Sequence, residues 1–443
     1  MKHAKKYWIF IFALLLLLGM AGCGETVAGP TGSTDSMQAS GTVDNPGNTD
    51  GPDNTKDPDH TDEPGKTEEL GNTGELEGTI LVKSDQNWEK AFSRGEGVFS
   101  DQGFYYLDAH ILTFLDTEAG VSTPLCTRAG CLHGDAPGHG YEECDGYGNV
   151  RTYGDMVTYW DGYLYYVRTE ASGAYRLYRC NAIGTEHTEV CQLGKRYTDD
   201  EKTLMPAITQ AAADGKWYYH TRVSGLVRDP ETGAGRFQQI LEYIAVVDLT
   251  TGKETVLLED KNDLLLILAA SSNGVLYTAQ ENVSGELWGN RRIALKFWNK
   301  ETGKIGTLLE KTGDDLYWGC DGKVRGTTYM GDVDYTFDLA TGEEKQLTGV
   351  QVYHNWLNGY ANYQDPDTMQ WYLVHLQTEE KLPSEVPLDK MIVQQTGEHG
   401  AVLLWIVEAA ASGNSREQRM CYVTYEALED GLQESDLLCY LTR

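Results

Sequence analysis

The 443-residue chain is strongly acidic: 67 Asp and Glu residues against 36 Lys and Arg residues give a formal net charge of −31. A surface of this charge repels phosphate backbones, and the sequence contains no Lys/Arg cluster that forms a local exception. Nucleic acid is therefore excluded as a partner. The length allows one large domain or two ordinary ones behind the terminal segments described next.

The first 22 residues have the three-part composition of a secretory signal peptide. Three lysines within the first six residues give a basic start, an apolar run covers residues 7–18, and small residues lead to Cys23. The apolar run is shorter than the roughly 20 residues of a membrane-spanning helix. The segment therefore predicts export from the cytoplasm.

The residues Met20-Ala21-Gly22-Cys23 resemble a bacterial lipobox, the site at which a cysteine is lipid-modified and becomes the mature N-terminus. The resemblance implies that residues 1–22 are removed and that Cys23 carries the lipid. It implies a protein anchored to the cell membrane at its extracytoplasmic face, where several acyl chains bind more stably than one. The alternative is an ordinary signal peptide that ends near a cysteine.

Residues 23–77 predict a disordered acidic linker behind the lipid-modified cysteine. The stretch from Gly24 to Glu77 has no Phe, Trp, Tyr or Cys, and its 13 acidic residues against two lysines give a net charge of −11. Such a segment buries too little apolar surface to offset the entropy lost on ordering. As a flexible coil it spans roughly 40 Å, the length of a stalk that lifts a domain away from the lipid.

From residue 78 onward the sequence contains a weak internal repeat built from two pieces. The first is a tight turn followed by an aromatic strand, as in Asp161 to Tyr166 and Asp214 to Tyr219. Asp-Gly and Asn-Gly favour tight hairpin turns because these residues tolerate positive φ. The second piece is a strand, a Thr-Gly turn and another strand, as in Asp248 to Lys253 and Asn299 to Lys304.

The spacing of these pieces predicts the fold. Successive copies of the first piece are 59, 53, 59, 41, 44 and 41 residues apart. Periods of about 40 to 50 residues that carry four short strands are typical of propeller blades. We therefore predict that residues 78–443 form an all-β domain, a β-propeller of about seven four-stranded blades preceded by a disordered tether. The spacing also allows six or eight blades.

This patterning resembles β-propellers of the bacterial surface, in the broad company of TolB-like and quinoprotein-like propellers. The segment from Thr79 to Lys83 is predicted to add a strand to the last blade and to close the ring. The alternative fold is a pair of β-sandwiches, which explains strands and turns but not seven paired copies.

One segment, residues 124–148, interrupts the repeat between the first two blades. It places Cys126, Cys131, His133 and Cys144 within 19 residues. Zinc takes four ligands tetrahedrally from Cys and His, so these residues predict a structural zinc site. Close Cys-Cys-x-His clusters are also similar to those of propeller lipoproteins of Gram-positive gut bacteria, a likeness that implies a structural element. The alternatives are a disulfide that joins Cys131 to Cys144 or to Cys126, and free thiols.

The other cysteines indicate structural roles. Cys180 and Cys191 lie on the two arms of a predicted hairpin, as do Cys421 and Cys439. Each pair is predicted to close a disulfide across the strand ladder, although buried cysteines also serve as small hydrophobic residues. Cys320 has no evident partner.

No residue set in the sequence defines a reaction. A Gly-x-Ser-x-Gly elbow, a phosphate-binding Gly-rich loop before a helix and a calcium-loop pattern are all absent. His220, His354 and His375 lie in or beside aromatic strands and are predicted to be packing residues. Tryptophans occur in most blades and should fill the spaces between blades, while aromatic residues in the blade loops should be exposed on one face.

These observations predict a lipid-anchored, extracytoplasmic β-propeller that acts as a non-catalytic binding or scaffolding module. Its expected ligand is a glycan, a peptide or an envelope protein, bound through the aromatic loops of one face. The alternative is an enzyme, a polysaccharide-active lyase or hydrolase with its site at the propeller channel. A third option is that the cysteine cluster senses metal or redox state. Propellers host all three functions, so the fold alone does not choose.

Overall fold

The structure is a computed structural model, and the residues it describes belong to the unit Glu68–Arg443. The described ranges are 89–90, 97–108, 111–133, 144–147, 157–170, 173–198, 202–204, 209–228, 234–281, 291–318, 323–328, 334–347, 360–365, 367–375, 378, 380–386, 391–397, 399–408, 416–429 and 431–441. The predicted signal peptide, Cys23 and the linker to residue 77 lie outside these ranges, as does Cys320.

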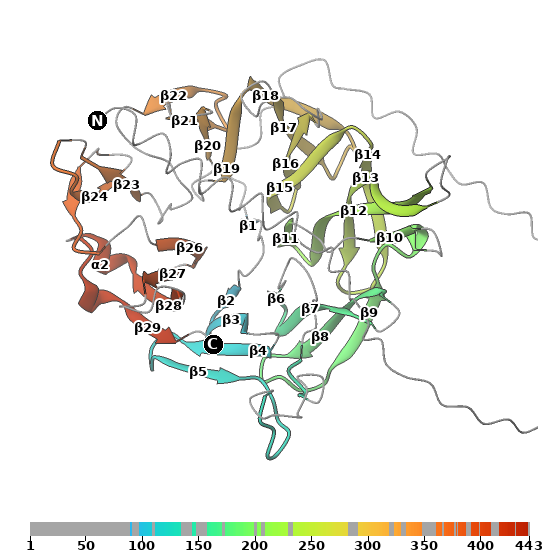
Figure 1. The fold of residues 1–443 in the computed structure, drawn as a ribbon, viewed down its shortest axis with the longest axis horizontal. Coiled ribbons are helices and arrows are strands. Elements are labelled where there is room, and N and C mark those ends of the chain that lie inside the picture. Colours follow the sequence, from blue (N-terminus) through green and yellow to red (C-terminus); the bar gives the residue numbers. More distant parts are fainter. Residues whose placement is uncertain are drawn as a thin grey trace, which may run out of the picture. The chain divides into compact units, whose positions relative to one another are not determined.

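The described residues form seven antiparallel sheets, in which neighbouring strands are almost always consecutive in the chain (Figure 1). The first sheet consists of β2 (Val98–Ser100), β3 (Gly103–Asp108), β4 (Ile111–Asp116) and β5 (Val121–Pro124). The second consists of β6 (Val157–Trp160), β7 (Tyr163–Thr169), β8 (Tyr175–Asn181) and β9 (Thr188–Gln192). The third consists of β10 (Lys202–Leu204), β11 (Thr209–Ala213), β12 (Lys216–Arg228), β13 (Gly235–Asp248) and β14 (Glu254–Asp260).

The remaining four sheets follow the same order. The fourth consists of β1 (Glu89–Lys90), β15 (Asp263–Ser271), β16 (Gly274–Glu281), β17 (Arg292–Asn299) and β18 (Ile305–Thr312). The fifth consists of β19 (Asp314–Trp318), β20 (Lys323–Thr328), β21 (Asp334–Asp338) and β22 (Glu344–Leu347). The sixth consists of β23 (Tyr360–Gln364), β24 (Trp371–His375) and β25 (Lys381–Pro383). The seventh consists of β26 (Met391–Thr396), β27 (Gly400–Glu408), β28 (Arg416–Thr424) and β29 (Leu438–Leu441).

The strands are rich in aromatic residues because a neighbouring sheet packs on each face of a sheet. Side chains alternate between the two faces of a strand. In β12, Trp217 and Tyr219 pack against the second sheet, whereas Tyr218 between them packs against the fourth. All three side chains are at most 1% exposed. Burying each stabilises the fold by roughly 1.5–3 kcal/mol, so consecutive aromatic residues favour a sheet enclosed between two others.

The core clusters lie between neighbouring sheets, and one of them joins the two ends of the domain. Phe104 and Tyr106 of the first sheet pack against Val402 and Tyr422 of the seventh. Because the last sheet packs on the first, the sheets follow one another around a ring, as Figure 1 shows. The all-β fold and its β-propeller architecture are thereby confirmed. The number of blades stays a prediction, since the seven sheets are those of the described residues.

The predicted turn motifs occur where the sequence places them. The side-chain Oδ1 of Asp248 accepts hydrogen bonds from the backbone N–H groups of Thr250 and Thr251 at 3.0 and 2.8 Å. Asn299 and Asp338 make the same pair of bonds in their own turns. A glycine with φ near 70° ends each of these three turns, a conformation that favours glycine. The motif is thus a local hydrogen-bonded unit and not only a compositional pattern.

The first strand that the structure describes belongs to the fourth sheet. β1 pairs with β15 through Glu89 opposite Ala270 and Lys90 opposite Ala269, and so extends the fourth sheet and not the last. The first and seventh sheets each have four strands drawn from one stretch of chain. Thr79 to Lys83 lies outside the described residues.

Helix is scarce in the part of the chain that the structure describes. The α-helix there is α2 (Tyr425–Glu429). The 3₁₀ turns are Lys195–Tyr197 and Glu434–Asp436. Among these residues, no helix combines the length and the hydropathy that crossing a membrane requires.

Candidate metal centre

The chain folds the two ends of the insert back onto the same strand. The backbone N–H of Leu125 donates to the carbonyl of Leu112, and the N–H of Leu112 donates to the carbonyl of Gly146. Ile111 and Tyr147 form an isolated antiparallel bridge next to these bonds. Both flanks therefore lie on β4, so Cys126 and Cys144 are brought side by side although 18 positions separate them.

Two positions in the insert depend on unusual backbone geometry. A Cβ at Gly146 would lie 2.5 Å from the carbonyl oxygen of Leu125, so only glycine permits this close approach. Between Cys126 and Cys131 the N–H of Cys131 bonds to the carbonyl of Arg128 at 3.2 Å and closes a tight turn. His133 then adopts a φ of 50°, a left-handed conformation uncommon for a non-glycine residue.

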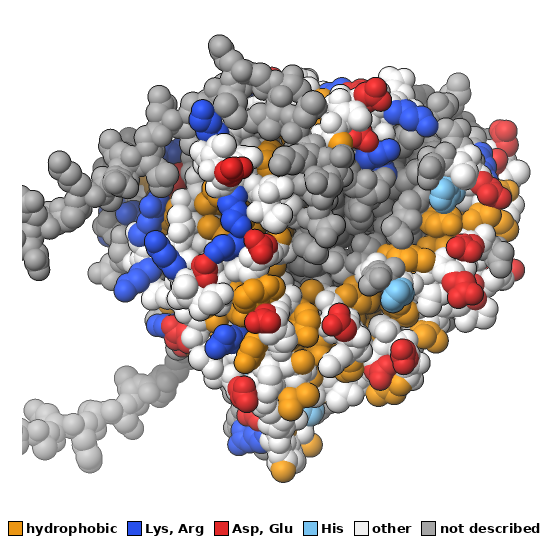
Figure 2. Space-filling model, turned by 180° about the vertical axis from the view of Figure 1, so that it is seen from behind, with side chains coloured by type: hydrophobic (Ala, Val, Ile, Leu, Met, Phe, Trp, Pro, Cys, Tyr) orange, Lys and Arg blue, Asp and Glu red, His pale blue; other side chains and the backbone are white. Residues whose placement is uncertain are grey.

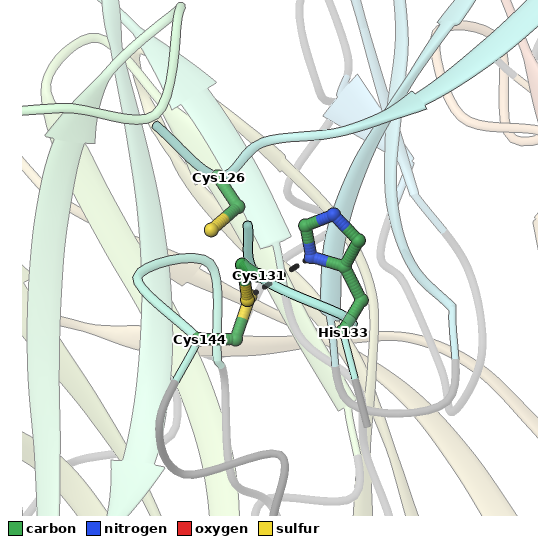
Figure 3. Close-up of side chains that lie close together, drawn as sticks. All are labelled: Cys126, Cys131, His133 and Cys144. Carbon is green, nitrogen blue, oxygen red and sulfur yellow. Dashed lines mark hydrogen bonds between the residues drawn. The ribbon is translucent and has the colours of Figure 1, made fainter. Parts of the chain in front are cut away.

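The result is a cluster of four ligand atoms, shown in Figure 3. The Sγ atoms of Cys126, Cys131 and Cys144 and a ring nitrogen of His133 all lie within 4.8 Å of one another. The Nδ1 atom of His133 is 3.4 Å from the Sγ of Cys144. A tetrahedral zinc ion with sulfur ligands at about 2.3 Å holds those atoms ~3.8 Å apart. The structure therefore brings together the four residues predicted from sequence, at separations that fit a tetrahedral ion.

Thiol chemistry at the cluster favours a metal. All three cysteines are free thiols. Burial raises the pKa of Cys126, but hydrogen bonds from the backbone N–H groups of Arg128 and Asp145 and from the neighbouring thiols outweigh it, so the pKa lies below its ordinary value. Burial, followed by the Cys126 hydrogen bond, raises the pKa of Cys144 to about 12. A bound cation replaces such shared protons, because metals bind the thiolate.

The cluster also joins the first sheet to the second. Leu125 packs in one core with Val157, Leu164 and Tyr166 of the second sheet. Arg168 Nη2, from β7, donates to the carbonyl oxygen of Asp145 at 3.4 Å. An ion at the cluster would therefore hold a connection that crosses between two blades.

One of the two predicted disulfides outside the insert is not formed, because Cys180 and Cys191 are free thiols. The pairing of β8 with β9 places Leu177 opposite Cys191, and a register shift follows between Leu177 and Tyr178. Cys180 lies in the core toward the first sheet, whereas Cys191 packs against the core toward the third. The two side chains thus point to opposite faces, and burial raises both pKa values to about 12.

The second predicted pair has a different outcome. Cys421 is disulfide-bonded. In the pairing of β28 with β29 it lies directly opposite Cys439, the partner that the sequence predicts. The two arms of this hairpin keep the register that a bridge needs.

A second polar cluster was not predicted from the sequence. The carboxylate of Glu242 is 1% exposed and accepts four hydrogen bonds. His220 Nε2 and the backbone N–H of Leu265 donate to Oε2 at 2.9 and 2.6 Å. Arg222 Nε and Gln239 Nε2 each donate to Oε1 at 2.8 Å. The only sequence signal is a charged residue inside the apolar run from Ile240 to Val247.

The environment of this cluster lowers the pKa values of His220 and Glu242. Burial lowers the pKa of His220 below its ordinary value, more strongly than Glu242 raises it. Burial raises the pKa of Glu242, but the hydrogen bonds and charges of His220, Leu265 and Arg222 outweigh burial and lower it. The structure confirms the packing role predicted for His220. His375 accepts a hydrogen bond from the N–H of Thr378 within a turn, and His354 lies outside the described residues.

No protein-family model matches this chain, and no curated protein sequence matches it. Solved structures with a similar fold include an oligogalacturonate lyase from Vibrio parahaemolyticus, with 12% identity, coverage of 78% of this chain and 93% of that chain, and a TM-score of 0.45. They also include TolB from Acinetobacter baumannii, at 15% identity over 76% and 77% of the two chains with a TM-score of 0.31.

A third similar structure is the β-propeller domain of the trilobed protease from Pyrococcus furiosus, at 12% identity over 60% and 79% of the two chains with a TM-score of 0.35. The chain is thus a β-propeller protein by its own sheets. Its function has to be argued from its own residues.

Proposed function

We propose that this chain is a lipid-anchored β-propeller of the extracytoplasmic membrane face that acts as a non-catalytic binding or scaffolding module. A structural zinc ion, held by Cys126, Cys131, His133 and Cys144, stabilises the connection between its first two sheets. The observation that carries this proposal is the convergence of the four ligand atoms within 4.8 Å.

The donor set favours zinc in a structural role. Three cysteine sulfurs and one imidazole nitrogen complete the four positions of a tetrahedral site, so a bound zinc keeps no open position for a substrate. Cys144 is 5% exposed, and the other three ligands are half-buried. A metal site between two blades with all four positions filled by protein ligands suits a structural role and not Lewis-acid catalysis.

The acid–base groups of the described residues support binding over catalysis. His220 and Glu242 are the pair that most resembles a catalytic dyad, yet their side chains are 0% and 1% exposed. Both oxygens of Glu242 already accept two hydrogen bonds each. A substrate therefore has no access to this carboxylate.

The anchoring part of the proposal rests on residues 1–23 and on the acidic linker that follows them. A lipid at Cys23 and a stalk of 54 residues suit a module that meets a glycan, a peptide or an envelope protein near the membrane. The acidic charge of the chain argues against nucleic acid as a partner.

Native mass spectrometry of the protein purified without reducing agent tests the metal assignment. We expect one zinc ion per chain, lost in Cys126→Ser and retained in the control Cys191→Ala, whose thiol lies outside the cluster. A metal-free mass that is short by two hydrogens beyond the two lost at the Cys421 disulfide, with this extra loss removed by Cys126→Ser or Cys144→Ser, would instead make the insert a disulfide.

A further inference from the structure

The third sheet has a hairpin that extends beyond its neighbours. β12 and β13 remain paired up to Arg228 opposite Gly235, whereas β14 pairs with β13 only from Glu242 to Val247. We call residues 222–228 and 235–241 the β12–β13 extension. Within the described residues, no strand covers the outer edge of β13 from Gly235 to Leu241. An uncovered edge presents a row of backbone donors and acceptors that a further strand can pair with.

The base of this extension is held by the buried carboxylate described above. Glu242 ties Arg222 of β12 and Gln239 of β13 to the backbone N–H of Leu265 in the fourth sheet. A buried charge is costly unless every lone pair has a donor, and here each oxygen has two. The network fixes the direction of the extension before any partner arrives, and preorganisation reduces the entropy lost on binding.

The extension exposes apolar side chains that its own sheet does not cover. Phe237 is 54% exposed and Val227 is 41% exposed. Among the Phe, Tyr and Trp residues whose burial the structure describes, only Phe237 is classed as exposed. The tryptophans whose burial is described are packed in or against the cores, so among such residues the exposed aromatic group predicted for a binding face is found on this hairpin.

The charge of the extension is opposite to that of the chain. Its two strands contain Arg222, Arg228 and Arg236 and no carboxylate, although residues 78–443 carry a net charge of −23. The sequence that joins the two strands, residues 229–234, contains Asp229 and Glu231. Arg222 is paired with Glu242. Within the described residues, no carboxylate lies at salt-bridge distance from Arg228 or Arg236. Figure 2 shows Lys and Arg side chains gathered at the left of that view, the side on which β12 and β13 lie.

Topology places the extension on the same face of the ring as the metal cluster. Each sheet runs up and down from its inner strand to its outer strand. The hairpin from second to third strand and the connection to the next sheet therefore emerge on one face, and the Asp-Gly and Thr-Gly turns on the other. β12 and β13 are the second and third main strands of their sheet, and the Cys/His insert is such a connection.

We propose that the outer edge of β13 from Gly235 to Leu241 binds an extended acidic polypeptide segment by strand addition. Backbone hydrogen bonds along the edge hold the segment, Phe237 contacts an apolar side chain, and Arg228 and Arg236 meet its carboxylates. This inference rests on the binding role proposed above and names its surface and partner. Edge pairing selects a polypeptide, because it needs backbone amides.

A second copy of this chain is the other occupant that could pair with the edge. Antiparallel edge-to-edge pairing of two copies over Gly235–Leu241 would set Arg236 opposite Ile240 of the other copy, so no carboxylate of the paired strands would face this arginine. An acidic segment supplies carboxylates along the edge, which a second copy does not. Charge complementarity therefore favours an acidic segment over self-association.

Fluorescence anisotropy with two synthetic probes tests this surface on the full-length protein purified in detergent. The first probe is a labelled heptapeptide that alternates Glu and Val, and the second alternates Lys and Val. We expect saturable binding of the acidic probe alone. Arg228→Glu combined with Arg236→Glu should weaken it by tenfold or more, and Phe237→Ser by about tenfold. Ile183→Ser, which alters a side chain 68% exposed in a turn of the second sheet, is the matched control and should bind like wild type.

Backbone pairing is tested with the same acidic probe methylated at alternate amide nitrogens, which should not bind. Equal binding of the acidic and basic probes, full binding of the methylated probe, or no loss in Phe237→Ser would overturn the inference. So would a dimer in sedimentation that Phe237→Ser dissolves. Zinc content is measured on the same samples. If the protein contains zinc but does not bind the acidic probe, this inference alone is refuted. If it binds the probe but contains no zinc, only the proposed structural zinc site is refuted.

Discussion

The Cys/His insert and the β12–β13 extension are two irregular parts of one ring that are held by different chemistry. The insert has turns in place of a strand ladder, and of its four ligands only Cys144 is fully buried. The extension keeps the full ladder between β12 and β13 and adds one buried carboxylate at its base. A segment that lacks strand pairing needs several metal ligands to hold it. A paired hairpin needs only one buried hydrogen-bonded group to fix its direction.

Metal removal should produce the largest difference between the insert and the extension. With zinc chelated, we expect residues 125–133 and 144–147 to lose their amide protection, because apparent zinc-binding energies of about 10–16 kcal/mol are available to such sites. The extension should keep its protection. Hydrogen exchange followed by mass spectrometry measures both regions in one sample. Unchanged exchange in the insert after chelation would mean that no metal holds it.

Removal of the buried carboxylate should have the next largest effect. Glu242→Ala leaves Arg222 and His220 without their partner, so we expect the free energy of unfolding to fall by about 3–5 kcal/mol. Glu301→Ala, which alters an exposed turn residue, is the control and should stay within ~0.5 kcal/mol of wild type. Urea denaturation measures both. A small effect of Glu242→Ala would mean that the ladder alone orients the extension.

Acid should weaken the same network in two steps. Burial lowers the pKa of His220 from its ordinary 6.5, so below that pH the unfolded chain binds a proton that the folded protein does not. The pKa of Glu242 is lowered from 4.5, so its contribution is complete above that value and is lost as pH falls through the folded pKa.

Stability should therefore decrease with acidification first below about pH 6.5 and again below about pH 4.5. Thermal unfolding as a function of pH measures this profile. His220→Gln should remove the first step and Glu242→Gln the second. A profile that is flat from pH 7 to pH 5 in wild type would contradict the contribution of His220.

The smallest effect is expected at the exposed end of the extension. Phe237→Ser should change the free energy of unfolding by less than ~0.5 kcal/mol, because the side chain is already 54% exposed. The matched variant Phe297→Ala removes a ring that is 1% exposed and should cost about 3–5 kcal/mol. A large fall in the free energy of unfolding of Phe237→Ser would show that this ring stabilises the fold and is not reserved for binding a partner.

The repeat and the metal cluster were predictable because their signals are local. The Asp-Gly turns and the turns after Asp248, Asn299 and Asp338 are closed by hydrogen bonds within a few residues, so short sequence windows contain their cause. The cluster was predictable because Cys126, Cys131 and His133 share one turn region. Cys144 joins them through a return to β4 that the chain makes only 18 positions later.

The errors involve relations between strands. The bridge from Cys180 to Cys191 was expected from a hairpin, but a one-residue register shift turns the two side chains to opposite faces. The pairing of β1 with β15, which adds a strand to the fourth sheet, was not predicted from the sequence. Register and partner choice depend on packing over a whole sheet, which a sequence window does not contain.

The sequence by itself determined the strand-and-turn repeat, the acidic charge, the candidate lipidation site and the four candidate metal ligands, because each depends on composition or on neighbours in the chain. Only the tertiary structure decided that Glu242 is buried beneath four donors and that Phe237 lies on an uncovered strand edge. Both depend on which strands end early and which sheets lie next to each other. Those features arise from packing among residues far apart in sequence.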